Sequence, residues 1–186
     1  MKQRNELRKL VLASSFVAIS IVINIFFKQI LGMRNFGVPF YAIPLVYGSI
    51  ILGPIYGIIM GLVSDWVGFV IAPSGDFSLL FSLSSMVWGF VPGLFLYKKY
   101  NRVKLFVLVA ITHVLATLAN TIGLLLFLPV ETALATLPYR IVLIPVNVVI
   151  MGHSIHQLVV KLKTLAGEIT LKPAEDYQLE QIANKP

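Results

Sequence analysis

The pattern of hydrophobic and polar positions divides the chain into long apolar runs that are separated by short polar connections. The runs are continuous, and they lack the alternation of apolar and polar residues that is typical of strands in a membrane β-barrel. A helix that spans the membrane needs ~20 largely apolar residues. The pattern therefore predicts six membrane helices, at residues 10–27, 38–52, 55–72, 79–97, 105–128 and 140–162.

The second apolar run is the shortest of the six, and Pro39 and Pro44 interrupt it. A turn at Gly53-Pro54 separates it from the third run. From residue 167 the chain is polar and charged, which is typical of a disordered or loosely helical tail. We therefore expect a transmembrane domain at residues 1–166 and a cytoplasmic tail at residues 167–186.

The composition supports a membrane protein, because 58% of the residues are hydrophobic, only 12% are charged and the mean hydropathy is +0.87. Soluble domains are about half apolar and about a quarter charged. A chain of 186 residues cannot bury such an apolar surplus in a soluble core. The predicted fold class is an all-α integral membrane protein in the lipid bilayer.

The Lys and Arg residues are distributed unequally between the two sides that six spans define. With the N-terminus inside, twelve of the fifteen lie inside, and Lys28, Arg34 and Arg140 lie outside. Cytoplasmic loops carry an excess of Lys and Arg, so both termini are predicted to be cytoplasmic. This distribution also accounts for the net charge of +7 without a nucleic-acid partner.

Polar residues within the apolar runs concentrate toward the outer half of the predicted bundle. Such residues are costly in lipid and mark either packing contacts or a functional site. Those expected in the outer half are Asn24, Asp65, Ser82, Ser84, Ser85, Asn120, Thr121, Asn147 and, at the rim, Arg140; His113, His153 and His156 are expected in the inner half. A polar cluster open only to the outside predicts a pocket that captures a solute, rather than a pore.

Structural explanations for the same residues remain open at this point. A hydrogen bond to a neighbouring helix would also explain why Asp65 lies in an apolar run. An interaction with lipid headgroups would also explain the position of Arg140. Asn120 and Asn147 are explained by hydrogen bonds between helices. The pair His153 and His156 lacks a carboxylate companion, so no metal site is predicted.

Small residues recur at intervals of four, a spacing that lets helices approach closely. Gly53, Gly57 and Gly61 form one such series, and Gly89 with Gly93 forms another, which predicts packing within the chain. Ser14 and Ala18 repeat the pattern on the first helix. Contact with a helix of a partner protein is one explanation for this pair.

Motifs for catalysis are absent from the sequence. It contains no Gly-x4-Gly-Lys-[Ser/Thr] phosphate loop, no Gly-x-Ser-x-Gly motif and no His-Glu-x-x-His motif. The chain contains no cysteine. We therefore expect neither an enzyme nor a cofactor, and a capture protein would take its energy from a partner.

Three stretches of the sequence resemble the substrate-binding S components of energy-coupling factor (ECF) vitamin transporters. The first is ILGPIYG at residues 51–57 with GLVSDWVG at 61–68, and the second is GFVPGLFLYKK at 89–99. The third, LPYRI at residues 137–141, is similar to an element that precedes the sixth helix in the folate-type branch. The resemblance covers about residues 10–162.

The resemblance implies a six-helix S component in a bacterial cell membrane, with a vitamin site that faces outward. It also implies a complex with a membrane-embedded T subunit and two cytoplasmic ATPase subunits. Ser14 and Ala18 occupy the positions of small residues that contact the T subunit in this family. The loop PSGDFS at residues 73–78 departs from the Phe-Pro-Gly-Phe run expected of a folate binder, so the vitamin stays open.

The leading hypothesis is high-affinity capture of folate for ATP-driven uptake by the partner subunits. Arg34 or Arg140 would pair with a ligand carboxylate, because a guanidinium binds a carboxylate bidentately. The aromatic side chains expected to stack on a flat ring are Phe77, Phe81, Trp88 and Tyr139. Asn120 and Asn147 would bind the polar edge of the ring.

Other hypotheses remain open. Pantothenate has a carboxylate but no ring, and it would need fewer aromatic residues; another water-soluble vitamin, such as a pyrimidine or pyridoxine precursor, is a further alternative. In a different class, the chain would be a structural membrane subunit without a ligand. A membrane enzyme ranks last, because no catalytic constellation is visible.

Overall fold

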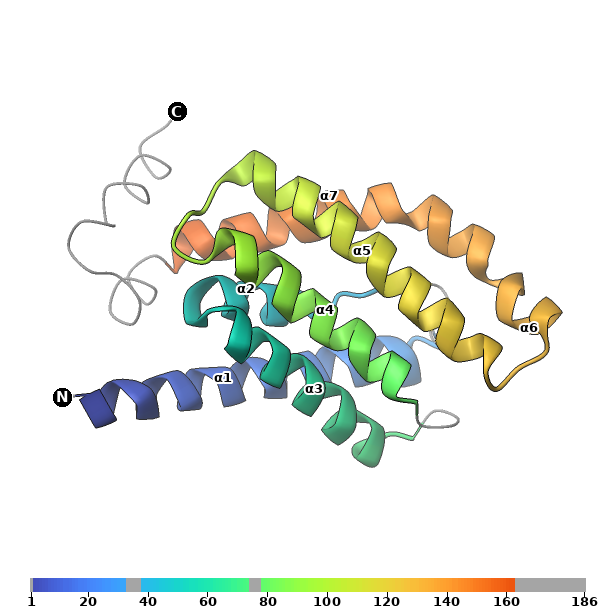
Figure 1. Ribbon diagram of the computed structural model, residues 1–186, viewed down its shortest axis with the longest axis horizontal. Helices are drawn as coiled ribbons and strands as arrows, with labels where there is room; N and C mark the ends of the chain where they lie inside the picture. Colours follow the sequence, from blue (N-terminus) through green and yellow to red (C-terminus); the bar gives the residue numbers. More distant parts are fainter. Residues whose placement is uncertain (1, 33–37, 74–77, 163–186) are drawn as a thin grey trace.

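The computed structural model describes residues 2–32, 38–73 and 78–162, and the described part of the chain is helical without a β-strand. Figure 1 shows the helices lying roughly alongside one another in a bundle. The helices are α1 (Lys2–Ile25), which continues as the π-helix η1 (Phe26–Ile30), α2 (Ala42–Leu52), α3 (Pro54–Ile71), α4 (Leu79–Leu96), α5 (Arg102–Leu125), α6 (Val130–Ala135) and α7 (Leu137–Lys161).

The predicted all-α class is confirmed, and the hydropathy of the helices is compatible with a membrane protein. Five helical stretches in the described residues are long and apolar enough to cross a membrane, and α2 is a shorter apolar helix. The prediction of a helix from residue 38 was wrong, because α2 begins only at Ala42. The short helix α6 was also not predicted. The proposed tail at residues 167–186 lies outside the described residues.

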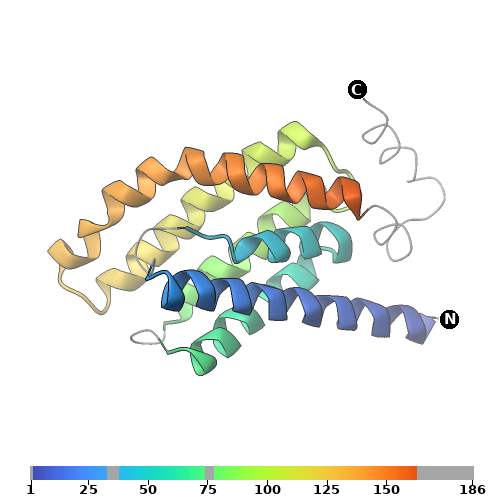
Figure 2. The same ribbon diagram turned by 180° about the vertical axis from the view of Figure 1, so that it is seen from behind.

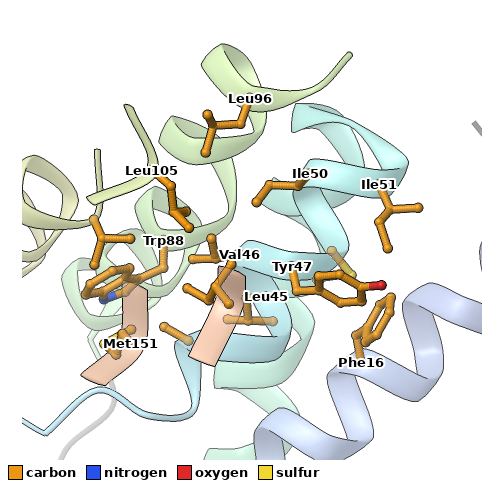
Figure 3. Close-up of a cluster of buried hydrophobic side chains, with 14 of the residues drawn as sticks. Phe16, Leu45, Val46, Tyr47, Ile50, Ile51, Trp88, Leu96, Leu105 and Met151 are labelled. Carbon is orange, nitrogen blue, oxygen red and sulfur yellow. The ribbon is translucent and has the colours of Figure 1, made fainter. Parts of the chain in front are cut away.

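The short helix α2 forms the centre of the bundle. Every residue of α2 except Ile43 is buried, and Figure 2 shows α2 lying between α1 and α7. Its side chains contact residues of several helices. The rings of Tyr47 and Phe16 pack edge to face, with their centres 5.5 Å apart. Figure 3 shows this cluster, in which Trp88 and Met151 also lie. The helix is therefore surrounded by protein rather than by lipid.

Helices α3 and α4 approach each other closely because glycine occupies the contact points. A Cβ atom on Gly57 would overlap the carbonyl group of Gly89, and one on Gly61 would overlap that of Ser85. Gly93 meets Ser49 of α2 in the same way. The prediction of packing within the chain is confirmed for Gly57, Gly61, Gly89 and Gly93, whereas Gly53 has a φ of 102° and only ordinary contacts at the turn between α2 and α3.

Polar contacts tie the helices together at the end of the bundle that carries the N-terminus. The hydroxyl of Tyr56 in α3 donates a hydrogen bond of 3.1 Å to Glu6 in α1, and Lys9 pairs with the same carboxylate at 2.9 Å. Tyr100 belongs to the connection between α4 and α5, and its hydroxyl lies 2.8 Å from Nδ1 of His156 in α7. Burial raises the pKa of Tyr100 above its usual range, so the hydroxyl stays neutral at physiological pH. We call this region the N-terminal end.

The close contact between α3 and α4 leads to a first prediction. Replacing Gly61 by alanine should force the two helices apart and lower stability by about 1–3 kcal/mol, the usual cost of overpacking. Gly68→Ala is the matched control, because a Cβ there would meet only Asn24, at an ordinary 3.8 Å. That control should be neutral or slightly stabilising, since alanine favours helix.

Thermal unfolding of both variants is measured in detergent, as the fraction of the protein that remains monodisperse after heating. Gly61→Ala should melt below the wild type and Gly68→Ala should not. Equal melting temperatures for the two variants would contradict the proposed packing.

Candidate functional site

A partly open cavity of about 230 Å³ lies at the end of the bundle opposite the N-terminal end. Five helices and the segment before α2 contribute to its wall. The polar and aromatic residues that line it are Asn24, Phe27, Lys28, Gln29, Tyr41, Asp65, Phe69, Phe81, Ser85, Trp88, His113, Thr117, Asn120 and Arg140. We call this region the cavity end.

The π-helix η1 brings three consecutive residues to the cavity. Phe27, Lys28 and Gln29 all line it, as do Ile23, Asn24 and Ile25 at the end of α1. The amide of Gln29 donates a hydrogen bond of 3.4 Å to the carbonyl of Ala72 at the end of α3. Nζ of Lys28 lies 5.9 Å from the ring centre of Tyr41. Short π-helical segments often mark functional sites in helices, and this one places a cation at the cavity wall.

The non-helical segment before α2 forms another part of the wall. Val38, Pro39 and Tyr41 line the cavity, and Ser20 of α1 donates a hydrogen bond of 2.8 Å to the carbonyl of Tyr41. Within a membrane, non-helical backbone is tolerated where it is buried in protein or lines a cavity. This accounts for the late start of α2, whose 11 residues extend about 16 Å.

The carboxylate of Asp65 lies on the wall where α3 faces α4. The hydroxyl of Ser82 donates a hydrogen bond of 2.7 Å to Oδ2 of Asp65. The expected hydrogen bond from Asp65 to a neighbouring helix is therefore confirmed. Because Asp65 also lines the cavity, its carboxylate is available to a ligand as well.

Trp88 and His113 form a buried aromatic pair at the cavity, with ring centres 5.5 Å apart in an edge-to-face arrangement. Nε2 of His113 lies 3.1 Å from Nδ2 of Asn147. An amide nitrogen is only a donor, so Nε2 is the acceptor. The ring proton then sits on Nδ1, which lies 3.4 Å from the hydroxyl of Thr117. The orientation of His113 is thus fixed from both sides.

The structure brings four of the eight predicted binding residues together around the cavity: Phe81, Trp88, Asn120 and Arg140. Asn147 is buried behind His113 and does not line the cavity. Tyr139 is 62% exposed and points elsewhere, because neighbouring residues of a helix point about 100° apart and Arg140 faces inward. Arg34 and Phe77 lie outside the described residues.

Several lining residues were not among the predicted binding residues. The sequence indicates a polar group in the outer half at Asn24, Asp65 and Ser85, without a binding role. It indicates Lys28 only as a charge on the outer side. Tyr41 gave no signal in the sequence. His113 was expected in the inner half, but the structure places it at the cavity.

The charges at the cavity favour an anionic ligand. Among the described lining residues there are two cations, Lys28 and Arg140, and one carboxylate, Asp65. Arg140 is only 8% exposed, and its guanidinium can bind a carboxylate bidentately. The aromatic residues offer flat faces for a ring.

Comparison with known proteins identifies the family of this chain. The sequence pattern of the family described as "ECF transporter, substrate-specific component" matches residues 8–160. The chain belongs to this family. The resemblance noted in the sequence is thereby confirmed, and a substrate-binding subunit, not an enzyme, is the role that the family has.

A curated relative is the folate transporter FolT of Clostridium novyi (strain NT). It is 34% identical to this chain over 113 residues, which are 59% of this chain and 66% of the relative. The match thus spans slightly less than two thirds of the relative's length. The comparison with solved structures found no match.

The contact between Asn147 and His113 leads to a second prediction. Asn147→Leu should leave the buried Nε2 of His113 without its donor and lower stability by about 1–3 kcal/mol. Ser154→Ala on the same helix is the control, because the Ser154 hydroxyl bonds only to the carbonyl of Ile150 one turn earlier. Thermal unfolding in detergent should separate the two variants. An Asn147→Leu protein as stable as Ser154→Ala would show that the contact contributes nothing.

Proposed function

We propose that this chain captures folate from outside the cell for an ATP-driven ECF transporter. The observation that carries the proposal is the one-sided cavity, which combines cationic and aromatic residues in a chain of the substrate-specific family. The relative named folate transporter supports this choice of vitamin.

The cavity residues suit the chemistry of folate. The guanidinium of Arg140 can bind a carboxylate of the glutamyl group bidentately, and Lys28 adds a second positive charge. Phe81 and Trp88 offer aromatic contacts to the flat ring. Pockets for drug-sized ligands are usually about 300–1,000 Å³. A cavity of about 230 Å³ therefore holds part of folate, with the rest extending toward the opening.

The transmembrane arrangement in this proposal has six crossings with both termini in the cytoplasm. The second crossing combines α2 with the segment that precedes it, because α2 alone covers about half of the ~30 Å hydrocarbon layer. Most described cations lie at the N-terminal end, whereas Lys28 and Arg140 lie at the cavity end. The positive-inside rule then directs the cavity outward.

The energy for uptake would come from partner subunits in the bacterial cell membrane. The sequence carries no phosphate-binding loop for ATP. Ser14 and Ala18 are both exposed on α1, where small side chains would let a helix of the T subunit approach closely. Two cytoplasmic ATPase subunits complete the proposed complex.

Two alternatives fit the structure less well. Pantothenate would satisfy Arg140 and Lys28, but it has no ring to contact Phe81 and Trp88. A structural subunit without a ligand has no use for charged side chains at the depth of a membrane, where they are costly. The aromatic and charged lining together therefore favours folate.

Folate binding by the purified protein is the third prediction. The wild type should bind folate with a Kd below the micromolar range and bind pantothenate at least 100-fold more weakly. Arg140→Ala should weaken folate binding by about 10- to 100-fold, since it removes a charged hydrogen-bonding partner. Isothermal titration calorimetry measures each affinity.

The neighbouring substitution Tyr139→Ala is the matched control, because Tyr139 is exposed and does not line the cavity. It should leave the affinity unchanged. No saturable binding of folate below the micromolar range would refute folate as the substrate, and tight binding of pantothenate would replace it.

The proposed partner contact gives a fourth prediction. Ser14→Leu and Ala18→Leu should lower folate uptake by cells that carry the whole transporter at least five-fold, because the larger side chains would prevent close helix packing. Folate binding by the purified variants should stay unchanged. Ser15→Leu is the control, since it enlarges an exposed residue about 100° from Ser14 and about 60° from Ala18 around the same helix. Equal uptake by all three variants would argue against this contact.

A further inference from the structure

Asp65 is the only carboxylate among the described residues that line the cavity. Its Oδ2 accepts a hydrogen bond of 2.7 Å from Ser82. Ser85, on the same helix as Ser82, also interacts with the carboxylate, and Lys28 of η1 attracts it electrostatically. Because Asp65 lines the cavity, the acceptor sites that the two serines leave are within reach of a ligand.

The chemistry of a carboxylate defines the ligand group that fits this position. An ionised carboxylate is only an acceptor, and its two oxygens offer about four acceptor sites. Ser82 occupies one of them. The complementary group is a planar pair of parallel N–H donors, which forms two charge-assisted hydrogen bonds with the carboxylate. The 2-amino group and N3–H of a 2-amino-4-oxopyrimidine edge provide such a pair.

The position of Asp65 suits the ring of a ligand rather than its anionic end. Asp65 lies six residues before the end of α3, about 9 Å from the end of the helix. Ser85, on the facing helix, also lines the cavity, and Trp88 follows one turn further along α4. Lys28 in η1 and Arg140 in the first turn of α7 belong to the cations of the lining. The cavity therefore combines an acceptor on α3 with cations on η1 and α7.

We propose that Asp65 binds the 2-amino-4-oxopyrimidine edge of the ligand and that Ser82 holds its carboxylate in position. Asp65 then selects ligands with paired N–H donors, whereas the cationic residues select only for negative charge. The proposal rests on the proposed function and deepens it, because it assigns the recognition of the pterin ring to one side chain. Carboxylates without this edge, such as pantothenate, bind more weakly because they offer no paired N–H donors to Asp65.

The alternative is that Asp65 only holds α3 to α4 through Ser82. Both explanations predict that an Asp65 variant loses stability, so stability cannot distinguish them. The chemistry of the ligand can, because only direct recognition depends on the 2-amino group.

The experiment compares folate with 2-desaminofolate, in which hydrogen replaces the 2-amino group. The wild type should bind folate about 10- to 100-fold more tightly than the analogue, as expected for a hydrogen bond to a charged group. Asp65→Asn should reduce this ratio to less than three-fold, because an amide offers one donor and one acceptor. Titration calorimetry on purified protein gives all four affinities.

Two controls separate recognition from folding. Para-aminobenzoylglutamate keeps the anionic end of folate and lacks the pterin, so Asp65→Asn should bind it as the wild type does. Ser82→Ala keeps the carboxylate, and it should retain a clear preference for folate over the analogue.

The outcomes distinguish this inference from the proposed function. Equal affinity of the wild type for folate and 2-desaminofolate overturns the role of Asp65, although folate capture stands. The role of Asp65 is also overturned if Asp65→Asn weakens the binding of folate, 2-desaminofolate and para-aminobenzoylglutamate equally, since the role of Asp65 would then be structural. The wild-type comparison decides even where the Asp65 variant does not fold. Absence of folate binding to the wild type refutes the proposed function itself.

Discussion

The close approach of α3 and α4 is the contact on which the site depends. Gly57 and Gly61 on one helix meet the backbone of Gly89 and Ser85 on the other, where no Cβ atom fits. Asp65 follows Gly61 one turn later and lies within hydrogen-bonding distance of Ser82 because the two backbones are so near. The same packing that stabilises the bundle therefore sets the position of Asp65, the one carboxylate among the described residues that line the cavity.

The shortness of α2 helps to explain the cavity at the end of the bundle opposite the N-terminal end. Its residues fill the space between α1, α3, α4 and α7 with apolar side chains, among them Leu45, Val46 and Tyr47, which are at most 1% exposed. Residues 38–41, just before Ala42, are not helical, and this segment lines the cavity instead of filling it. One end is consequently a packed core, while the other retains space for a ligand.

Much of the fold followed from the sequence, because apolar length and the position of charges are properties of each segment alone. The side of the cavity, together with Phe81, Trp88, Asn120 and Arg140, was predicted on the same basis. The direction of each side chain was not predictable. Tyr139 differs from Arg140 only in the face of α7 on which it lies, whereas Asn147 lies on nearly the same face as Arg140 but two turns further along the helix, against His113. Lys28 lies on a π-helix that has no signature in the sequence.

The division between a packed end and a polar end also bears on how such a protein can be both stable and functional. Charged and polar side chains at the cavity cost free energy at the depth of a membrane, and the apolar core around α2 offsets this cost. A ligand that binds the folded state and not the unfolded chain stabilises the folded state by an amount that grows with its concentration and affinity. The polar residues that are costly in a membrane are thus the same residues that can bind a ligand. This is why a cavity with charges of both signs favours a capture protein over a structural subunit.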